Sequence, residues 1–145
     1  MPMSDATLPR FEKCAIVIDG ALPTGLAMNA AAVLALSIGD AYGDSALGPE
    51  VKDRDGQVHH PITEVPLPVL KADPEVLRGI VAKALAEPDV FLVDMTSSAQ
   101  AARDYGSYMD AMQDTGSEAH VYVGVAVVGA KKAVQKLSGS LPLYR

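Results

Sequence analysis

The sequence predicts an α/β domain built around a mixed β-sheet. Short apolar segments alternate along the chain with longer segments of helical periodicity, which is the pattern of strand–helix–strand units. Residues 51–58 carry Asp55-Gly56 between two short segments, a hairpin signal that adds antiparallel pairing. A chain of 145 residues fits one domain, and about 70% of the surface of such a chain is buried on folding.

Four segments are predicted to be strands of the sheet. Three are apolar runs without polar alternation, as expected of strands buried on both faces; they are residues 14–18, 90–93 and 121–128. The fourth, residues 65–70, contains Pro66 and Pro68, which have no amide hydrogen to donate to a ladder. We therefore expect this strand to be irregular or to lie at an edge.

Residues 26–38 are predicted to form a helix that is buried on nearly all sides. Only Asn29 and Ser37 are polar in this segment, and a helix without a polar face is normally surrounded by protein. Gly39 offers a left-handed residue that would end the helix.

Three further helices are predicted. The clearest covers residues 74–86, because Asp73 is a good N-cap and Pro74 suits the first helical position. The other two are expected over residues 97–113 and 130–138.

The sequence also predicts the domain organisation. Residues 1–12 are expected to form a flexible polar tail, and residues 13–145 a single α/β domain.

The charge of the chain argues against two classes of partner. The net charge is −6 and the twelve Lys and Arg residues are scattered, the densest group being Lys131, Lys132 and Lys136. Proteins that hold nucleic acid by its phosphates usually present a basic patch. We therefore expect neither nucleic acid nor an anionic membrane surface as a partner.

The cysteine content and the N-terminus favour a cytoplasmic protein. Cys14 is the single cysteine and has no internal disulfide partner, which fits a reducing compartment. The first residues lack the apolar core of a secretory signal. No apolar run reaches the ~20 residues that span a bilayer.

Several familiar motifs are absent on close reading. Residues 22–25 read LPTG but lack the spacer and the C-terminal position of a sortase signal. Residues 124–131 approach a phosphate-binding loop, but an alanine stands where its lysine should be. The adjacent His59 and His60 point to opposite faces of an extended chain, and His120 is distant. We expect no metal and no cofactor.

Five polar or small residues fall where strands end and the first helix starts: Asp19, Thr24, Gly25, Asn29 and Asp94. In α/β proteins such strand ends often carry functional groups, so these five are the candidate ligand-binding residues. Three of them have a structural alternative. Thr24 caps its own helix, buried Asn29 bonds a neighbouring loop, or Asp94 bonds the turn after its strand.

The two ends of the chain resemble a known fold. The apolar first strand, the turn at residues 22–25 and the alanine-rich helix resemble the opening of type-II peptidyl-tRNA hydrolases, and residues 116–145 resemble their last strand, last helix and closing tail. Over residues 13–145 the chain is more similar to an uncharacterised bacterial family, domain of unknown function two thousand. Its features here are the Leu-Pro-x-Gly turn, Asn29 and the Lys-Leu-Ser-Gly ending.

The resemblance implies a three-layer α/β/α sandwich around a mixed sheet of about four strands, often as a dimer. It does not imply the hydrolase activity. The hydrolases carry a lysine-rich Gly-Lys-Gly-Lys stretch at the first helix, and the matching positions here are Gly25, Leu26, Ala27 and Met28. Their Asp-Ala-Gly-Arg-Thr stretch has only Asp94 as a counterpart.

Two functions from different classes follow. The first is the binding, with or without hydrolysis, of a small molecule at the mouth near Asn29. The alternative is a non-enzymatic interaction protein that acts through a homodimer or another partner surface. A third, hydrolysis of peptidyl-tRNA, is disfavoured by the missing lysines.

Overall fold

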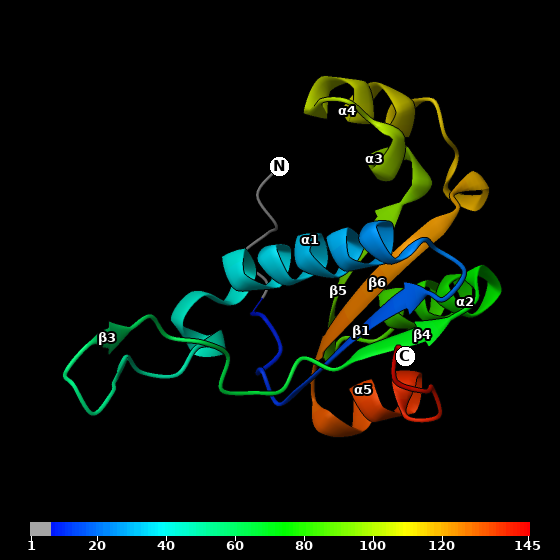
Figure 1. The fold of residues 1–145 in the computed structure, drawn as a ribbon. Coiled ribbons are helices and arrows are strands. Elements are labelled where there is room, and N and C mark those ends of the chain that lie inside the picture. Colours follow the sequence, from blue (N-terminus) through cyan, green and yellow to red (C-terminus); the bar gives the residue numbers. More distant parts are fainter. Residues whose placement is uncertain (1–6) are drawn as a thin grey trace.

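A four-stranded mixed sheet forms the centre of the computed structural model, which describes residues 7–145 (Figure 1). Its strands are β1 (Lys13–Asp19), β4 (Val69–Ala72), β5 (Val90–Thr96) and β6 (Tyr122–Gly129), in the order β4-β1-β6-β5. Strand β1 is parallel to β4 and antiparallel to β6, and β5 is antiparallel to β6. The predicted strands are confirmed, and the proline-preceded β4 lies at an edge.

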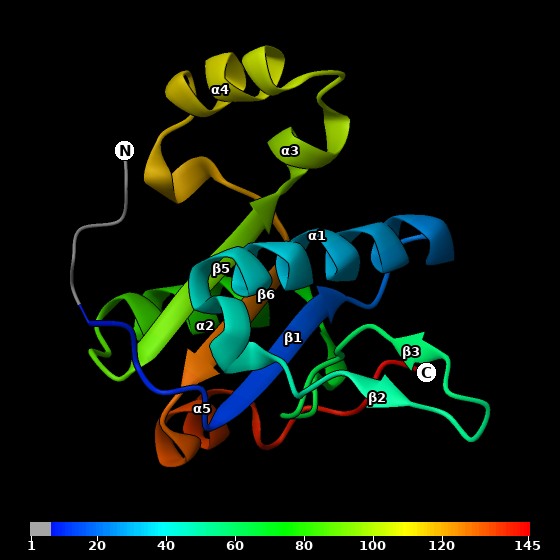
Figure 2. The same cartoon turned by 90° about the vertical axis from the view of Figure 1, so that its left-hand side faces the viewer.

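Helices cover both faces of this sheet. Helix α1 (Thr24–Tyr42) lies on one face, and helices α2 (Pro74–Leu85) and α5 (Lys131–Ser138) lie on the other (Figures 1 and 2). Side chains of β1 and β6 alternate between two apolar clusters, one under each layer of helices. Every residue of β6 is buried. The fold is therefore a three-layer α/β/α sandwich.

Helix α2 forms as its sequence predicts. The Asp73 carboxylate accepts a hydrogen bond from the Val76 amide at 3.0 Å, and Pro74 is the first helical residue. One stripe is buried against the sheet; it consists of Leu77, Ile80, Val81 and Ala84. The cap and the stripe together fix where α2 starts and which face it presents.

Helix α1 differs from its prediction in burial and in length. It buries one stripe only, which consists of Ala27, Ala30, Leu34, Ile38 and Tyr42. The helix continues past Gly39 and ends at Gly43, whose φ of 54° is left-handed. The prediction of burial on nearly all sides is wrong because, within residues 7–145, α1 is the one long helix on its face of the sheet, and its far side is exposed there.

The apolar outer side of α1 has a second consequence. Thr24–Ala46, which is α1 with the 3-10 turn Gly43–Ala46, is long and apolar enough to cross a membrane by length and composition. This finding contradicts the expectation that no apolar run is long enough to span a bilayer, although the buried stripe of α1 packs on the sheet. The far side of α1 presents Leu26, Val33 and Leu36 to solvent within the described residues.

The segment predicted as one helix over residues 97–113 forms two. Helix α3 (Ser97–Ala101) ends where Ala102 takes an extended conformation, with φ −73° and ψ 141°. Helix α4 (Tyr105–Gln113) then starts at Asp104, whose carboxylate accepts a hydrogen bond from the Ser107 amide at 2.7 Å. The aspartate cap opens a new helix in the middle of the segment. A 3-10 turn, Ser117–Ala119, leads on to β6.

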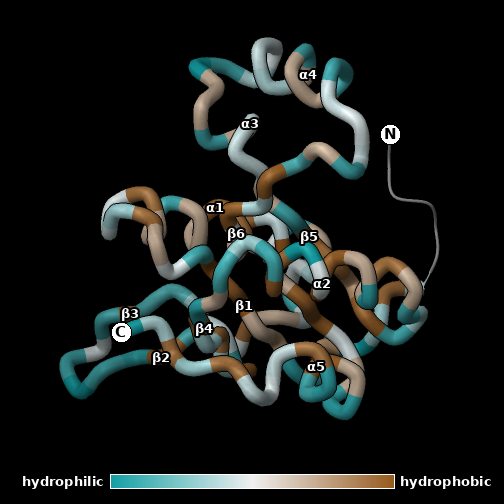
Figure 3. The backbone as a smooth tube through the Cα atoms, turned by 90° about the vertical axis from the view of Figure 1, so that its right-hand side faces the viewer, coloured by the Kyte–Doolittle hydropathy of each residue, from teal (hydrophilic) through white to brown (hydrophobic). Residues whose placement is uncertain are grey.

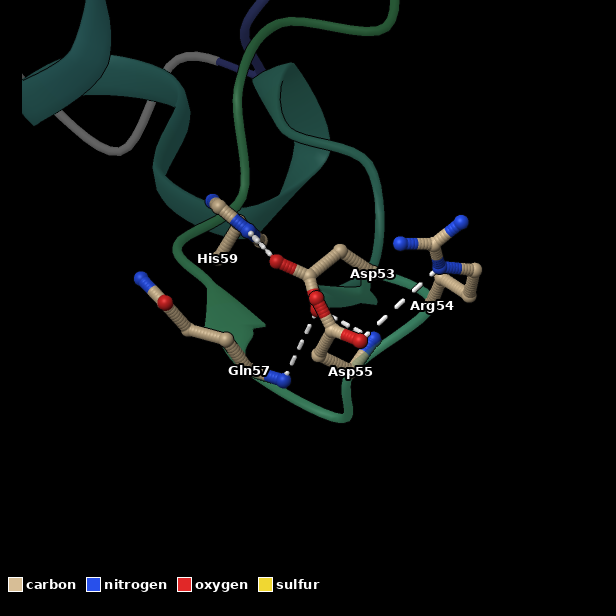
Figure 4. Close-up of polar contacts among 5 residues, drawn as sticks. All are labelled: Asp53, Arg54, Asp55, Gln57 and His59. Atoms are coloured by element: carbon tan, nitrogen blue, oxygen red, sulfur yellow. Dashed lines mark hydrogen bonds and ion pairs between the residues drawn. The ribbon is translucent and has the colours of Figure 1, made fainter.

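The predicted hairpin forms, but outside the main sheet. Strands β2 (Val51–Lys52) and β3 (Val58–His59) pair only with each other and make a projecting, mostly hydrophilic arm (Figures 1 and 3). Asp53 holds its turn by accepting hydrogen bonds at 3.0 Å from the amides of Asp55 and Gln57, and His59 lies 3.0 Å from its other oxygen (Figure 4). The mixed character of the main sheet comes instead from β6.

The chain before β1 packs on the core where it is described. Leu8 and Phe11 contact the α1-side cluster, and the Tyr42 hydroxyl donates a hydrogen bond to the Pro9 carbonyl at 2.7 Å. The expectation of a flexible tail also covers residues 1–6, which lie outside the described residues. Cys14 is buried in β1, and burial raises the pKa of its thiol to about 12.

Candidate functional site

The predicted site residues gather around one end of the sheet. Because β1 is parallel to β4, and both β1 and β5 are antiparallel to β6, three strands finish at the end where β6 begins. Asp19 closes β1, Asp94 lies near the end of β5, and α1 starts just after β1. The topology therefore places all five candidates at this end.

The residues at the start of α1 are exposed. Pro23, not Thr24, holds the N-cap position, and no side chain caps the helix. Thr24, Gly25 and Asn29 are exposed, so the expectation of a buried Asn29 is wrong. The Asp19 carboxylate accepts a hydrogen bond from the Ala21 amide at 2.9 Å and holds its own turn.

The side chain of Asp94 belongs to the other face of the sheet. Val93 packs against the α1-side cluster and Leu92 against the α2-side cluster. Successive side chains of a strand alternate between faces, so Asp94 follows Leu92 toward the α2 side. The structure therefore separates Asp94 from Thr24, Gly25 and Asn29, which lie on the helix of the opposite layer.

A β-bulge brings an aromatic ring to the Asp94 side of the sheet. Met95 pairs with Gly124 but Thr96 pairs with Tyr122, which leaves Val123 as an extra residue in β6. Val123 packs on the α1 side and Tyr122 on the α2 side. Without the extra residue, the alternation would turn Tyr122 away from Asp94.

Five side chains form what we call the strand-end cluster: Arg78, Asp94, Tyr108, His120 and Tyr122. The guanidinium carbon of Arg78 lies 5.6 Å from the centroid of the Tyr122 ring, and its group donates a hydrogen bond to the His120 carbonyl. The rings of His120 and Tyr122 are 6.2 Å apart between centroids. Arg78 therefore ties α2 to the segment that enters β6.

The electrostatics of the cluster centre on Asp94. Partial burial raises the pKa of the Asp94 carboxyl, and the nearby His120 opposes this rise. Burial, and then the negative charge of Asp94, raise the pKa values of the Tyr108 and Tyr122 hydroxyls. A tyrosine with an ordinary or a raised pKa is protonated at neutral pH, so both hydroxyls can donate hydrogen bonds there.

The Asp94 carboxylate has no bonded partner in the described part of the chain. Within residues 7–145, no hydrogen bond to its oxygens is formed, and the ion pairs involve only Arg54 with Asp55 and His59 with Asp53. The buried Nδ1 of His120 likewise has no hydrogen-bond partner there. The Asp94 side chain is exposed, so its carboxylate is accessible to another molecule, whereas the His120 Nδ1 is not.

Helix α4 stands away from the sheet above this end and contributes Tyr108 (Figures 1 and 2). None of its residues is fully buried. Its Tyr105 and Tyr108 rings meet edge to face at 5.4 Å, and the Thr96 hydroxyl donates a hydrogen bond to the Met112 sulfur at 3.5 Å. The cluster is thus bordered on one side by a lightly packed helix.

Sequence reasoning found one member of the cluster, Asp94, and missed four. Arg78 lies within the α2 pattern, Tyr108 within an apparent helical stripe, and His120 and Tyr122 on either side of a strand boundary. No local motif joins these positions; only the bulge and the fold bring them together. Across residues 7–145, no group of three His, Cys, Asp or Glu residues is placed to hold a metal.

The comparisons with known proteins identify a family but no activity. None of the curated proteins matches the chain. A solved structure of a protein of unknown function from Agrobacterium tumefaciens C58 superposes with a TM-score of 0.82 at 22% identity, covering 92% of this chain and 97% of that one. It supports the fold alone. The match described as protein of unknown function DUF2000 covers residues 12–145, so the chain belongs to the DUF2000 family.

Proposed function

We propose that the protein binds a small molecule through a positively charged nitrogen, with Asp94 of the strand-end cluster as its anionic partner. The observation that carries the proposal is the exposed Asp94 carboxylate, which forms no ion pair and accepts no hydrogen bond within residues 7–145, while the protein around it raises its pKa by desolvation. A protonated amine supplies both the charge and the donors.

The surroundings of Asp94 favour a cation over other ligands. Aromatic side chains attract cations through their ring faces. Tyr108, Tyr122 and His120 all lie near Asp94, and the Tyr122 ring already faces one cation, the Arg78 guanidinium. The tyrosine oxygens accept hydrogen bonds as well as donate them. An anionic ligand would meet the Asp94 charge directly, so we exclude it from the proposal.

We propose binding as the primary activity, in the cytoplasm. A carboxyl with a raised pKa can also exchange protons with a ligand, which leaves hydrolysis as an extension of the same site. Peptidyl-tRNA is not the ligand we propose, because the exposed start of α1 carries Leu26 and Met28 where a phosphate-binding surface needs lysines.

The test uses three fragments of the same size and different charge. n-Butylammonium, n-butanol and butyrate are titrated into the ¹⁵N-labelled full chain at pH 7, and amide shifts are followed by NMR. We expect n-butylammonium alone to shift the amides around residues 94, 108 and 120–122. Fragments this small bind weakly, so the titration extends to tens of millimolar, roughly the range that ligand efficiency allows.

The matched variants are Asp94→Asn and Asp110→Asn. Asp110 is an exposed carboxylate on α4, so it controls for the loss of one negative charge. We expect Asp94→Asn to weaken n-butylammonium binding by about tenfold or more, the equivalent of ~1.4 kcal/mol, and Asp110→Asn to leave it unchanged. Equal responses to the three fragments, or unchanged binding in Asp94→Asn, would contradict the proposal.

A further inference from the structure

Helix α4 turns an apolar stripe toward the ends of the strands. Four side chains spaced three and four residues apart share one side of this helix, which we call the α4 stripe: Tyr105, Tyr108, Met109 and Met112. The Met112 sulfur accepts a hydrogen bond from the Thr96 hydroxyl at 3.5 Å, and Tyr108 lies near Asp94. These two contacts fix the direction in which the stripe points.

The α4 stripe faces protein but is not covered by it. Tyr105 is 74% exposed and Met109 is 49% exposed, and within the described chain no residue of α4 is buried. Ser107 and Asp110, on the opposite side of the helix, are exposed as well. Figure 1 shows α4 standing off from the layers of the sandwich. A helix of nine residues depends on packing for its stability, so the open stripe indicates a contact that the chain itself does not supply.

The α4 stripe is continuous with the Asp94 site through Tyr108. Burial, and then the charge of Asp94, raise the pKa of the Tyr108 hydroxyl, while the Tyr108 ring meets the Tyr105 ring edge to face at 5.4 Å. A ligand held at the exposed Asp94 carboxylate can therefore extend along α4, where it meets aromatic rings and methionines. Methionine side chains adapt to apolar ligands of varied shape.

We propose that the ligand of Asp94 is an amine with an apolar tail, and that the tail lies against the α4 stripe. The inference rests on the proposed function and adds the class of the tail to it. The ammonium group pairs with Asp94, and the tail passes Tyr108 and covers Met109. The carboxylate favours this occupant over the apolar surface of another protein, because such a surface would bury Asp94 without a cation.

The test compares ethylammonium, n-butylammonium and n-hexylammonium, titrated into the ¹⁵N-labelled full chain at pH 7. A buried methylene strengthens binding by up to about fourfold. We therefore expect n-hexylammonium to bind at least about tenfold more tightly than ethylammonium. Hydrogen exchange of the amides of residues 109–113 should slow with saturating n-hexylammonium and stay unchanged with ethylammonium, because only the longer tail reaches this part of α4.

The matched variants are Met109→Gln and Leu85→Gln. Glutamine is a good helix former but is polar, so each variant removes one exposed apolar side chain from a helix. Leu85 is 75% exposed and is the last residue of α2, two turns beyond Arg78. We expect Met109→Gln to weaken n-hexylammonium binding by at least about threefold and to leave ethylammonium binding unchanged. Leu85→Gln should change neither, and circular dichroism establishes that both variants remain folded.

The outcomes separate this inference from the proposed function. If the three ions bind with equal affinity and Asp94→Asn weakens all three, the carboxylate binds amines but the apolar tail is overturned. A gain with tail length that Met109→Gln leaves intact also overturns the inference, because the tail then lies elsewhere. So do α4 amide shifts that depend on protein concentration without ligand, since another copy then covers the stripe. Binding that does not depend on Asp94 for any of the ions overturns both proposals.

Discussion

The guanidinium carbon of Arg78 lies 5.6 Å from the ring centroid of Tyr122, so that helix α2 is joined to the first residue of β6. The same guanidinium donates a hydrogen bond to the His120 carbonyl. This one side chain holds the segment that carries His120 against the helix, and the bulge in β6 turns Tyr122 to the side of Asp94. Arg78 is thus a positioning residue of the strand-end cluster.

Arg78→Met should destabilise the protein. The variant keeps the apolar stem but loses the cation–π contact and the charged hydrogen bond, for which we expect a cost of about 1–3 kcal/mol in the free energy of unfolding. Urea denaturation measures this cost. Lys83→Met on the same helix, at an exposed position, should change stability by less than ~0.5 kcal/mol. Equal costs for the two variants would show that Arg78 holds nothing in place.

Asp94→Asn should make the folded protein more stable at pH 7 and not at pH 3. Burial raises the pKa of Asp94 in the folded state, so charging this carboxyl costs stability as the pH rises through its folded pKa, and the cost is absent below its unfolded pKa. Asparagine removes the cost. Thermal unfolding of the wild type, Asp94→Asn and Asp110→Asn between pH 3 and pH 7 measures this cost. An Asp94→Asn variant that is less stable than the wild type at pH 7 would contradict the prediction.

Two glycine-to-alanine substitutions should act in opposite directions. A Cβ at Gly124 would lie 2.8 Å from the Ile18 Cδ1 and 3.0 Å from the Leu34 Cδ1, so Gly124→Ala overpacks the space under α1 and should cost about 1–3 kcal/mol. At Gly79, within α2, a Cβ meets no atom within 4 Å. Gly79→Ala should stabilise by up to ~1 kcal/mol. Denaturant unfolding measures the change in the free energy of unfolding for both variants. A Gly124→Ala variant as stable as the wild type would show that α1 and the sheet are not closely packed around Gly124.

The β2–β3 arm should loosen in acid without unfolding of the domain. The hydrogen bond with His59, and then the amide of Gln57, lower the pKa of Asp53 in the folded arm. The charged Asp53 carboxylate therefore stabilises the arm at any pH above the pKa that Asp53 has in the unfolded chain. This stabilisation is lost as the pH falls through the lower pKa of Asp53 in the folded arm. Amide exchange of residues 51–59 in wild type and Asp53→Asn measures this. Arm amides as protected in Asp53→Asn as in wild type would contradict the role of this turn.

The fold was predictable because its elements carry their own signals. The cap at Asp73, the apolar runs of β1, β5 and β6 and the Asp55-Gly56 turn each act over a few residues. The break at Ala102 was missed because the apolar stripe of residues 97–113 continues through it, and the Asp104 cap outweighs that stripe.

The candidate site was predictable only in part. Asp94 could be found because it is the first charged residue after an apolar strand. Arg78, His120 and Tyr122 meet through a bulge and a helix crossing that no local pattern announces. The exposure of Asn29 was not predicted for a different reason: the sequence of an apolar helix does not show whether protein covers its far side.

The measurement that tests the central claim most directly is the ¹³C NMR titration of the Asp94 carboxyl carbon in the full chain, with Asp94→Asn for assignment. We predict a midpoint above the ~3.9 of an ordinary aspartate, and a lower midpoint when n-butylammonium is added, because a bound cation favours the charged form. A midpoint at or below ~3.9 in the free protein, or one that n-butylammonium does not move, would contradict an uncompensated carboxylate that receives a cationic ligand.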